Sequence, residues 1–133
     1  MGKYTNIDEA IFTVFATAAW LERKIPTYVT NVPANKNDTQ FLRLNIIPSG
    51  KGVNIRSASG VLIIEIFVLR DRGTPPISKL ADALDAHLLG QSRPVSDGNV
   101  QFFSSNLGNG GPDSANPALY RADYSINFNY NEV

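Results

Sequence analysis

The chain has 133 residues, 43% of them hydrophobic, and its 12 basic and 12 acidic side chains give a formal net charge of zero. This length suits one domain that can bury a core. The balanced charge provides no basic excess to neutralise a phosphate backbone, which argues against a dedicated nucleic-acid binder. It also leaves little self-repulsion between copies. The chain contains no cysteine, which excludes disulfides, thiolate metal sites and cysteine nucleophiles.

The N-terminal residues and the apolar runs predict neither export nor membrane insertion. Residues 1–6 lack the apolar stretch of a secretory signal. The longest apolar run, residues 61–69, is interrupted by Glu65 and is too short to span a bilayer. We therefore expect no membrane partner.

The first predicted helix begins at Thr5 or Asn6, either of which can act as its N-cap. Pro26 ends the helical pattern at about Lys24. The apolar stripe of this helix recurs at helical spacing and consists of Ile7, Ile11, Val14, Ala18 and Leu21. The next predicted segments are a β-prone run at 27–31, a polar loop at 33–39 and an alternating strand at 40–47.

The middle of the chain alternates between glycine-rich and apolar segments. Glycines and charged residues at about 49–59 predict a mobile arm at the tip of a hairpin. A strand at 61–69 follows, and a turn at 70–76 leads to a second apolar helical stripe at 77–88. Gly90 is the predicted C-terminal stop of this helix.

The last third of the chain reads mainly as strands. Asp97 and Gly98 mark a tight turn before a strand at 100–104. The glycines and prolines of residues 106–117 predict a loop. Between Tyr120 and Tyr130, aromatic and aliphatic residues alternate with polar ones, which predicts a strand with one buried face.

The order helix, strands, helix, strands indicates an α+β fold. We expect an antiparallel or mixed β-sheet with two α-helices packed on one face, which is a two-layer sandwich. The whole of residues 1–133 forms one domain in this prediction.

The strand at 61–69 is apolar on both faces, although helices on one face would leave the other in solvent. Val61, Ile63, Phe67 and Leu69 point away from the expected helices. Burying Phe67 or Ile63 stabilises by about 1.5–3 kcal/mol each. Our hypothesis is that another subunit covers them, and the alternative is that the chain's own loops do so, chiefly residues 106–117.

The sequence offers little chemistry. His87, the one histidine, lies late in the second predicted helix. A helix C-terminus favours a partly exposed histidine there, so its position requires no catalytic role. Asp82 and Asp85 have the spacing of a solvated helix face. The glycine-rich segments match neither the GxxxxGK(S/T) nor the GxGxxG phosphate-binding motif. The aromatic residues of the last strand belong to its core face rather than to a base-stacking surface. We expect no enzyme activity, no cofactor and no metal.

Scattered segments between about Ile7 and Tyr130 carry a family resemblance. They are Asn31-Val32-Pro33, Gln40-Phe41-Leu42-Arg43-Leu44 running to Ile47-Pro48, Gly60-Val61 through Ile66-Phe67, Leu80-Ala81-Asp82-Ala83-Leu84, and the closing strand with Tyr120 and Tyr124. Together they resemble the tail terminator proteins of long-tailed bacteriophages, including the lambda-type minor tail protein. The charged turn Arg70-Asp71-Arg72 departs from the family, where this turn is often more neutral.

The resemblance implies a virion protein without catalytic residues, assembled in the host bacterial cytoplasm. Such subunits form a ring, usually a homohexamer, that caps the head-proximal end of the tail and stops tube polymerisation. The implied partners are copies of itself, the tail tube protein and a head-completion or neck protein, with DNA only passing through the lumen. We place the oligomer and tube contacts at Lys51, Gly52, Arg56, Ile63, Phe67, Arg70 and Arg72.

Two other classes of function remain open at this stage. One is another phage neck or tail completion protein, or a small binding module, of similar fold. The other is a small enzyme or ligand binder. Fold analogy alone does not choose among proteins of one architecture.

Overall fold

The computed structural model describes residues 2–35, 37–48, 57–95 and 97–132. Its elements in chain order are α1 (Lys3–Ala16), α2 (Ala18–Leu21), β1 (Thr27–Val29), β2 (Phe41–Pro48), β3 (Ser57–Leu69), α3 (Pro75–Leu88), β4 (Ser92–Val95), β5 (Gly98–Pro112) and β6 (Leu119–Glu132). The six strands of the described residues form one sheet in the order β1-β2-β3-β6-β5-β4. β1 is parallel to β2, and the other neighbouring pairs are antiparallel.

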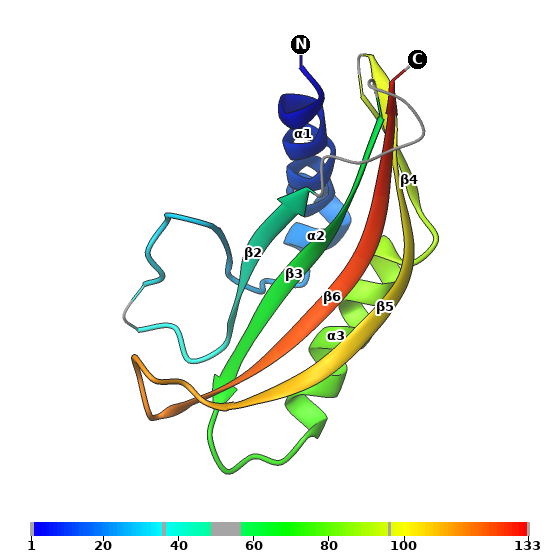
Figure 1. The fold of residues 1–133 in the computed structure, drawn as a ribbon. Helices are drawn as coiled ribbons and strands as arrows, with labels where there is room; N and C mark the ends of the chain where they lie inside the picture. Colours follow the sequence, from blue (N-terminus) through cyan, green and yellow to red (C-terminus); the bar gives the residue numbers. More distant parts are fainter. Residues whose placement is uncertain (1, 36, 49–56, 96, 133) are drawn as a thin grey trace.

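The α+β two-layer sandwich predicted from the sequence is wrong. The protein is mostly β, with 47% of the described residues in strands, and the sheet curls into a half-barrel (Figure 1). β3, β5 and β6 have 13, 15 and 14 residues, and strands of this length accumulate a large right-handed twist. The sheet therefore wraps around its short helices and does not present them with a flat face.

Residues 106–112 account for much of this difference. Their glycines predict a loop, but they form the second half of β5 and pair with β6 as far as Pro112 opposite Tyr120. The strand partner overrides the low β propensity of glycine, because such propensity depends on packing context. Register shifts between Phe102 and Ser105, and again near Gly111, bend this strand further.

The first helix is shorter than predicted and starts earlier. α1 begins at Lys3, and the backbone turns extended at Thr17, with ψ of 150°. The Thr17 hydroxyl accepts a hydrogen bond from the Trp20 N–H at 3.3 Å, which starts the separate helix α2. Asn6, a predicted cap, is instead buried inside α1, and its side-chain amide donates to the Tyr130 hydroxyl at 2.8 Å.

The second helix matches its predicted position. α3 carries Pro75 and Pro76 at its start, where a missing N–H costs nothing. Gly90 follows its end with a φ of 68°, a left-handed conformation that glycine adopts without strain.

The core lies on the concave side of the sheet. α1 contacts β4, β5 and β6, and α3 contacts β3 and β5. Alternate side chains of β3 and β6 face these helices and are fully buried, namely Leu62, Ile64, Ile66, Ala122, Tyr124 and Ile126. Gly60 lies inside β3 rather than before it. A Cβ there would come within 2.6 Å of both the Phe128 ring and the Ile47 carbonyl oxygen, so the position requires glycine.

Ile64 and Ile47 provide a matched pair for testing this assignment of the core. Ile64 is completely buried, whereas Ile47 is 46% exposed on β2. We expect Ile64→Ala to lower the free energy of unfolding by about 2–5 kcal/mol, because it leaves a cavity. Ile47→Ala should cost less than about 1 kcal/mol. Urea denaturation of both variants measures the difference, and equal costs would contradict this assignment of the two faces.

Candidate functional site

The outer face of the sheet carries a second, smaller hydrophobic cluster. This outer aromatic cluster consists of Tyr28, Phe41, Phe67 and Leu119, and Phe67 in it is only 3% exposed. The Phe41 and Phe67 rings stack with centroids 4.5 Å apart, and Tyr28 meets Phe41 edge-on at 5.9 Å. Both geometries are favourable for aromatic pairs.

The connection between β1 and β2 covers this cluster. Ala34 packs against it, and the Tyr28 hydroxyl donates a short hydrogen bond to the Asp38 carboxylate. This hydrogen bond raises the pKa of Tyr28. The chain's own residues thus surround Phe67, as in the alternative considered from the sequence, and they include Pro33, Ala34, Asn35, Asp38 and Leu119 as well as part of residues 106–117. Phe67 therefore keeps only 3% of its surface exposed in the isolated chain.

The other predicted contact residues are spread along the molecule. Ile63 is half-buried on the outer face, between Asn45 of β2 and Ser125 of β6. Arg70 and Arg72 are exposed in the turn after β3, which lies about 20 Å further along the strand. Lys51, Gly52 and Arg56 lie outside the described residues, as does most of the arm predicted at about 49–59. Ser57, Ala58 and Ser59 of that arm are the first residues of β3.

The turn after β3 is fastened to the connection between β5 and β6. The Arg70 guanidinium donates to the Pro117 carbonyl at 3.1 Å, and its backbone N–H donates to the Ala118 carbonyl at 3.1 Å. Asp71 and Gly73 both have positive φ, 63° and 69°. Arg72 therefore extends from a turn whose backbone is held in place.

A polar cleft of about 430 Å³ lies beside the outer aromatic cluster. Phe41 and Phe67 line it together with charged residues of both signs, namely Asp38, Arg43, Glu65, Asp113 and Arg121. Arg121 pairs with Glu65 at 3.4 Å, and Arg43 lies 5.7 Å from the centroid of the Phe67 ring. The mixed charges favour hydrogen bonding over attraction of one ion type. Sequence reasoning missed this cleft because it depends on how two loops are placed.

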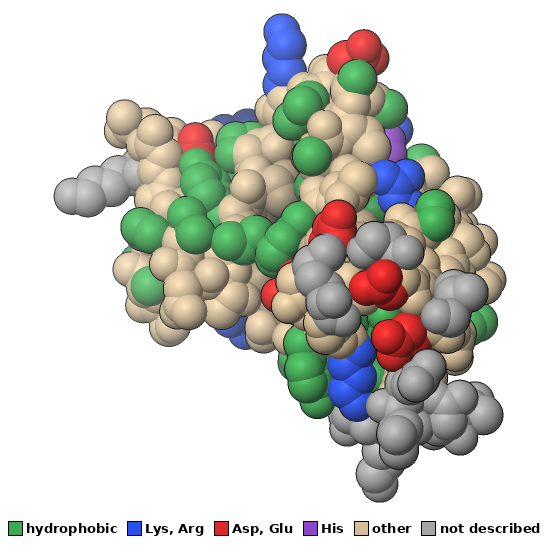
Figure 2. Space-filling view, turned by 90° about the horizontal axis from the view of Figure 1, so that it is seen from above, with side chains coloured by type: hydrophobic (Ala, Val, Ile, Leu, Met, Phe, Trp, Pro, Cys, Tyr) green, Lys and Arg blue, Asp and Glu red, His purple; other side chains and the backbone are tan. Residues whose placement is uncertain are grey.

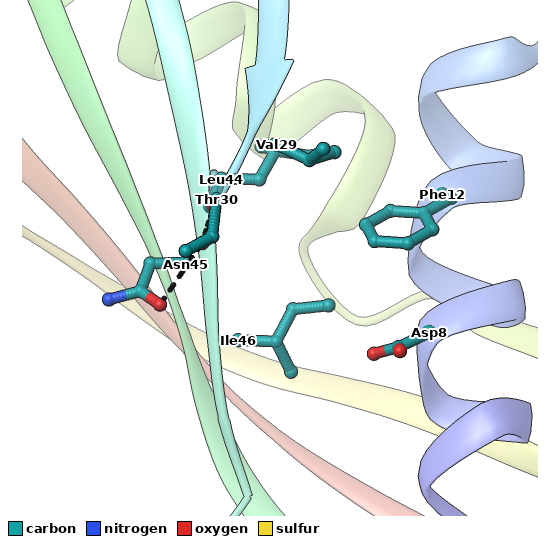
Figure 3. Close-up of a pocket in the computed structure, with 7 residues that line it drawn as sticks. All are labelled: Asp8, Phe12, Val29, Thr30, Leu44, Asn45 and Ile46. Carbon is teal, nitrogen blue, oxygen red and sulfur yellow. Dashed lines mark hydrogen bonds between the residues drawn. The ribbon is translucent and has the colours of Figure 1, made fainter. Parts of the chain in front are cut away.

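An apolar groove lies on the inner face of the sheet, between α1 and strands β1 and β2 (Figure 3). It consists of two adjoining cavities of about 390 and 340 Å³. We call it the edge groove; it is lined by Asp8, Phe12, Leu21, Val29, Leu44 and Ile46. Viewed from the end where α1 begins and β2 stops, hydrophobic side chains gather in a hollow of the surface (Figure 2).

Sequence reasoning also missed the edge groove, although one signal points to it. Phe12 is a large apolar residue outside the predicted helical stripe, and it is 39% exposed. Leu21, assigned to that stripe, is 61% exposed, because the helix breaks at Thr17 before reaching it. A large apolar side chain on the polar side of a helix is thus the usable clue.

His87 lies in a small polar contact between α3 and α2. Its Nε2 accepts a hydrogen bond from Arg23 Nε at 2.9 Å, and its ring meets Trp20 edge-on at 5.2 Å. Desolvation, and then the charge of Arg23, lower the pKa of His87. The geometry therefore requires a neutral imidazole.

Asp85 has a structural partner set that the sequence did not predict. It accepts hydrogen bonds from the Tyr124 hydroxyl at 2.6 Å and from the Ser105 hydroxyl at 2.7 Å. Burial, and then the hydrogen bond to Asp85, raise the pKa of Tyr124. This network fastens α3 to β5 and β6.

Two features of the described residues bear on membranes and metals. The longest helices there have 14 residues, which is too short for a transmembrane span. The same residues hold no group of three His, Cys, Asp or Glu side chains placed to ligate a metal ion.

Comparison with known proteins identifies related folds. No protein-family model matches the chain, and no curated protein matches it. A chain from the virion of a native gene transfer agent particle has a TM-score of 0.67 and 15% identity, covering 96% of each chain. Another solved structure, which has no descriptive name, has a TM-score of 0.66 and 14% identity, covering 98% of this chain and 94% of the other. At these identities the likeness shows the fold alone.

Truncating Phe67 tests whether the chain itself covers the outer aromatic cluster. We expect Phe67→Ala to lower the free energy of unfolding of the dilute, unassembled protein by about 3–5 kcal/mol, because a buried stacked ring is lost. Thermal and urea denaturation at low protein concentration measure this. A change below about 1 kcal/mol would mean that the ring is covered only by a neighbour.

Acid should weaken the fold through His87. Because the folded pKa is lower than the ordinary value of 6.5, the unfolded chain binds more protons between these two values. The contribution of His87 is complete above about pH 6.5 and is lost as the pH falls through the folded pKa. We expect urea stability to decrease from pH 7.5 to 5.5. The His87→Gln variant should show a flatter profile, since it removes the one histidine, and parallel profiles would refute this assignment.

Proposed function

We propose that the chain is a structural subunit of a phage-like virion. The observation that carries this proposal is the fold likeness to a chain from a gene transfer agent virion, because it extends over 96% of both chains. Several large apolar side chains stay exposed outside the core, including Phe12, Leu21 and Phe103. Exposed apolar residues that gather along a groove are typical of contact surfaces.

Within such a particle, the role we propose is that of a tail terminator. Copies of the chain, six by the family resemblance, form a ring on the head-proximal end of the tail tube. The ring stops tube polymerisation and presents a surface to a head-completion protein, while DNA only passes through its lumen. The support for this finer role is the pattern of segments from Asn31 to Tyr124 that resembles the family, together with the zero net charge, which lets copies associate without repulsion.

Growth of the tail tube provides the direct test. The purified chain is added to the tail tube protein of the same particle during polymerisation, and tube lengths and ends are recorded by electron microscopy. We expect shorter tubes with a ring on one end, because a bound ring occupies the site where the next tube subunit would add. Tube protein alone, and tube protein with an equal mass of an unrelated neutral protein, are the controls.

Two other results would point elsewhere. Unchanged tube lengths, with rings that bind the head-side protein, would replace the terminator role by another neck or tail completion role. Unchanged tubes and no binding to any virion protein would overturn the proposed function altogether.

A further inference from the structure

The edge groove combines a helix wall with a strand wall. Asp8 and Phe12 project from α1 toward it, and Val29, Leu44 and Ile46 face them from β1 and β2 (Figure 3). A groove between a helix and the edge strand of a sheet is the geometry in which proteins bind extended segments by strand addition. The main chain of the edge strand then supplies hydrogen bonds, and pockets accept alternate side chains.

The backbone of β2 offers such hydrogen bonds at the groove. The Leu42 N–H donates to the Pro26 carbonyl at 2.9 Å, so the polar groups of Leu42 point toward the β1 edge. Because these groups alternate along a strand, those of Leu44 and Ile46 point the same way. The Thr30 hydroxyl donates a hydrogen bond to the Leu44 carbonyl at 2.9 Å, and the pairing of β2 with β1 ends at Leu44. Within the described part of the chain, Ile46 has no strand partner on this edge.

The side chains of the groove favour an occupant that has apolar side chains and a positive charge near Asp8. Phe12 is 39% exposed and Leu21 is 61% exposed, so both have apolar surface left to bury. Asp8 lies at one end of the groove, and its partial burial raises the pKa of its carboxyl group. No basic side chain of the described residues forms an ion pair with it. A cation on the occupant would stabilise the charged form of Asp8.

We propose that the edge groove binds an extended segment from a second copy of this chain, with apolar residues at alternate positions and flanking cations. Residues 51–56, which lie outside the described residues, have this chemistry in the order Lys51, Gly52, Val53, Asn54, Ile55, Arg56. Val53 and Ile55 are the alternate apolar pair, and Lys51 and Arg56 supply the charge for Asp8. This inference rests on the proposed function, because an assembled virion holds copies of the chain together.

The described residues on either side of the segment favour a second copy, rather than the same chain, as the source of the occupant. Pro48 pairs with Gly60 of β3, and Ser57 pairs with Asn131 of β6, so both ends are joined to the sheet on the β3 side of β2. The edge groove lies on the other side of β2, beside β1. Within one chain, the flanking residues and the edge groove therefore lie on opposite sides of β2, which favours a segment supplied by a second copy.

Self-association of matched variants tests the proposal. Phe12→Asp places a charge in the groove, and the double variant Val53→Asp with Ile55→Asp does so in the segment. Leu89→Asp is the control, since Leu89 is 44% exposed just after α3 and does not line the groove. Sedimentation velocity over a range of concentrations should show association weakened by about tenfold or more in the first two variants and unchanged in the control. Circular dichroism and thermal melting check folding, and Leu21→Asp replaces Phe12→Asp if that variant unfolds.

Mixing the two defective variants gives the sharper readout. Phe12→Asp retains a competent segment, and the double variant retains a competent groove, so the mixture should recover pairs that neither variant forms alone. The groove assignment is overturned if the wild-type chain associates and neither Phe12→Asp nor Leu21→Asp weakens that association. It is also overturned if mixing the two defective variants restores no association. Both results leave the proposed function intact. A wild-type chain that stays monomeric at all concentrations and does not cap tubes would overturn both.

Discussion

The antiparallel pairing of β3, β6 and β5 is the constraint on which the rest of the structure depends. β6 lies between the other two long strands and pairs with β3 from Asn131 to Leu119 and with β5 from Glu132 to Tyr120. Strands of this length twist, and the two register shifts in β5 add to the curvature. The concave side then encloses α1 and α3, and the hydrophobic contacts made there provide most of the favourable free energy of folding.

The same pairing decides where surface is left for other proteins. The centre of the sheet is buried on its inner side, and the outer aromatic cluster with its covering connection closes part of the outer side. Besides the polar cleft on the outer face, what stays open is at the margins, namely the edge groove beside β2 and the exposed part of β5 that carries Phe103 and Leu107. In the proposed assembly, copies of the chain would therefore meet through the edges of the sheet more than through its face.

The periodicity of the sequence located most elements but not their curvature. The position of α3 and the left-handed Gly90 after it were predictable, because a helical stripe and a C-terminal glycine are local signals. The half-barrel was not predictable, since it depends on the long pairing of β5 with β6 and on bulges that leave no mark in the residue pattern. The second half of β5 has the composition of a loop and becomes a strand only because β6 pairs with it.

The candidate surfaces show the same limit. The apolar outer face of β3 was visible in the sequence, but the connection that covers Phe67 is polar and gave no sign of its position. The polar cleft needs two loops brought together from distant parts of the chain. The edge groove was partly predictable from the sequence, because Phe12 is a large apolar residue on the polar side of its helix. The break at Thr17, which exposes Leu21, was not predictable.

The contact between Asn6 and Tyr130 has a consequence for how the chain comes to be folded. It joins the first helix to the last strand across 124 positions, and both ends of the chain lie at the same end of the molecule (Figure 1). During synthesis, the apolar stripe of α1 therefore stays exposed to solvent until β6, one of the strands it packs against, has left the ribosome. Contacts so distant in sequence slow folding. A partly made chain would thus lack a finished core, so in the proposed assembly only copies that include β6 would associate.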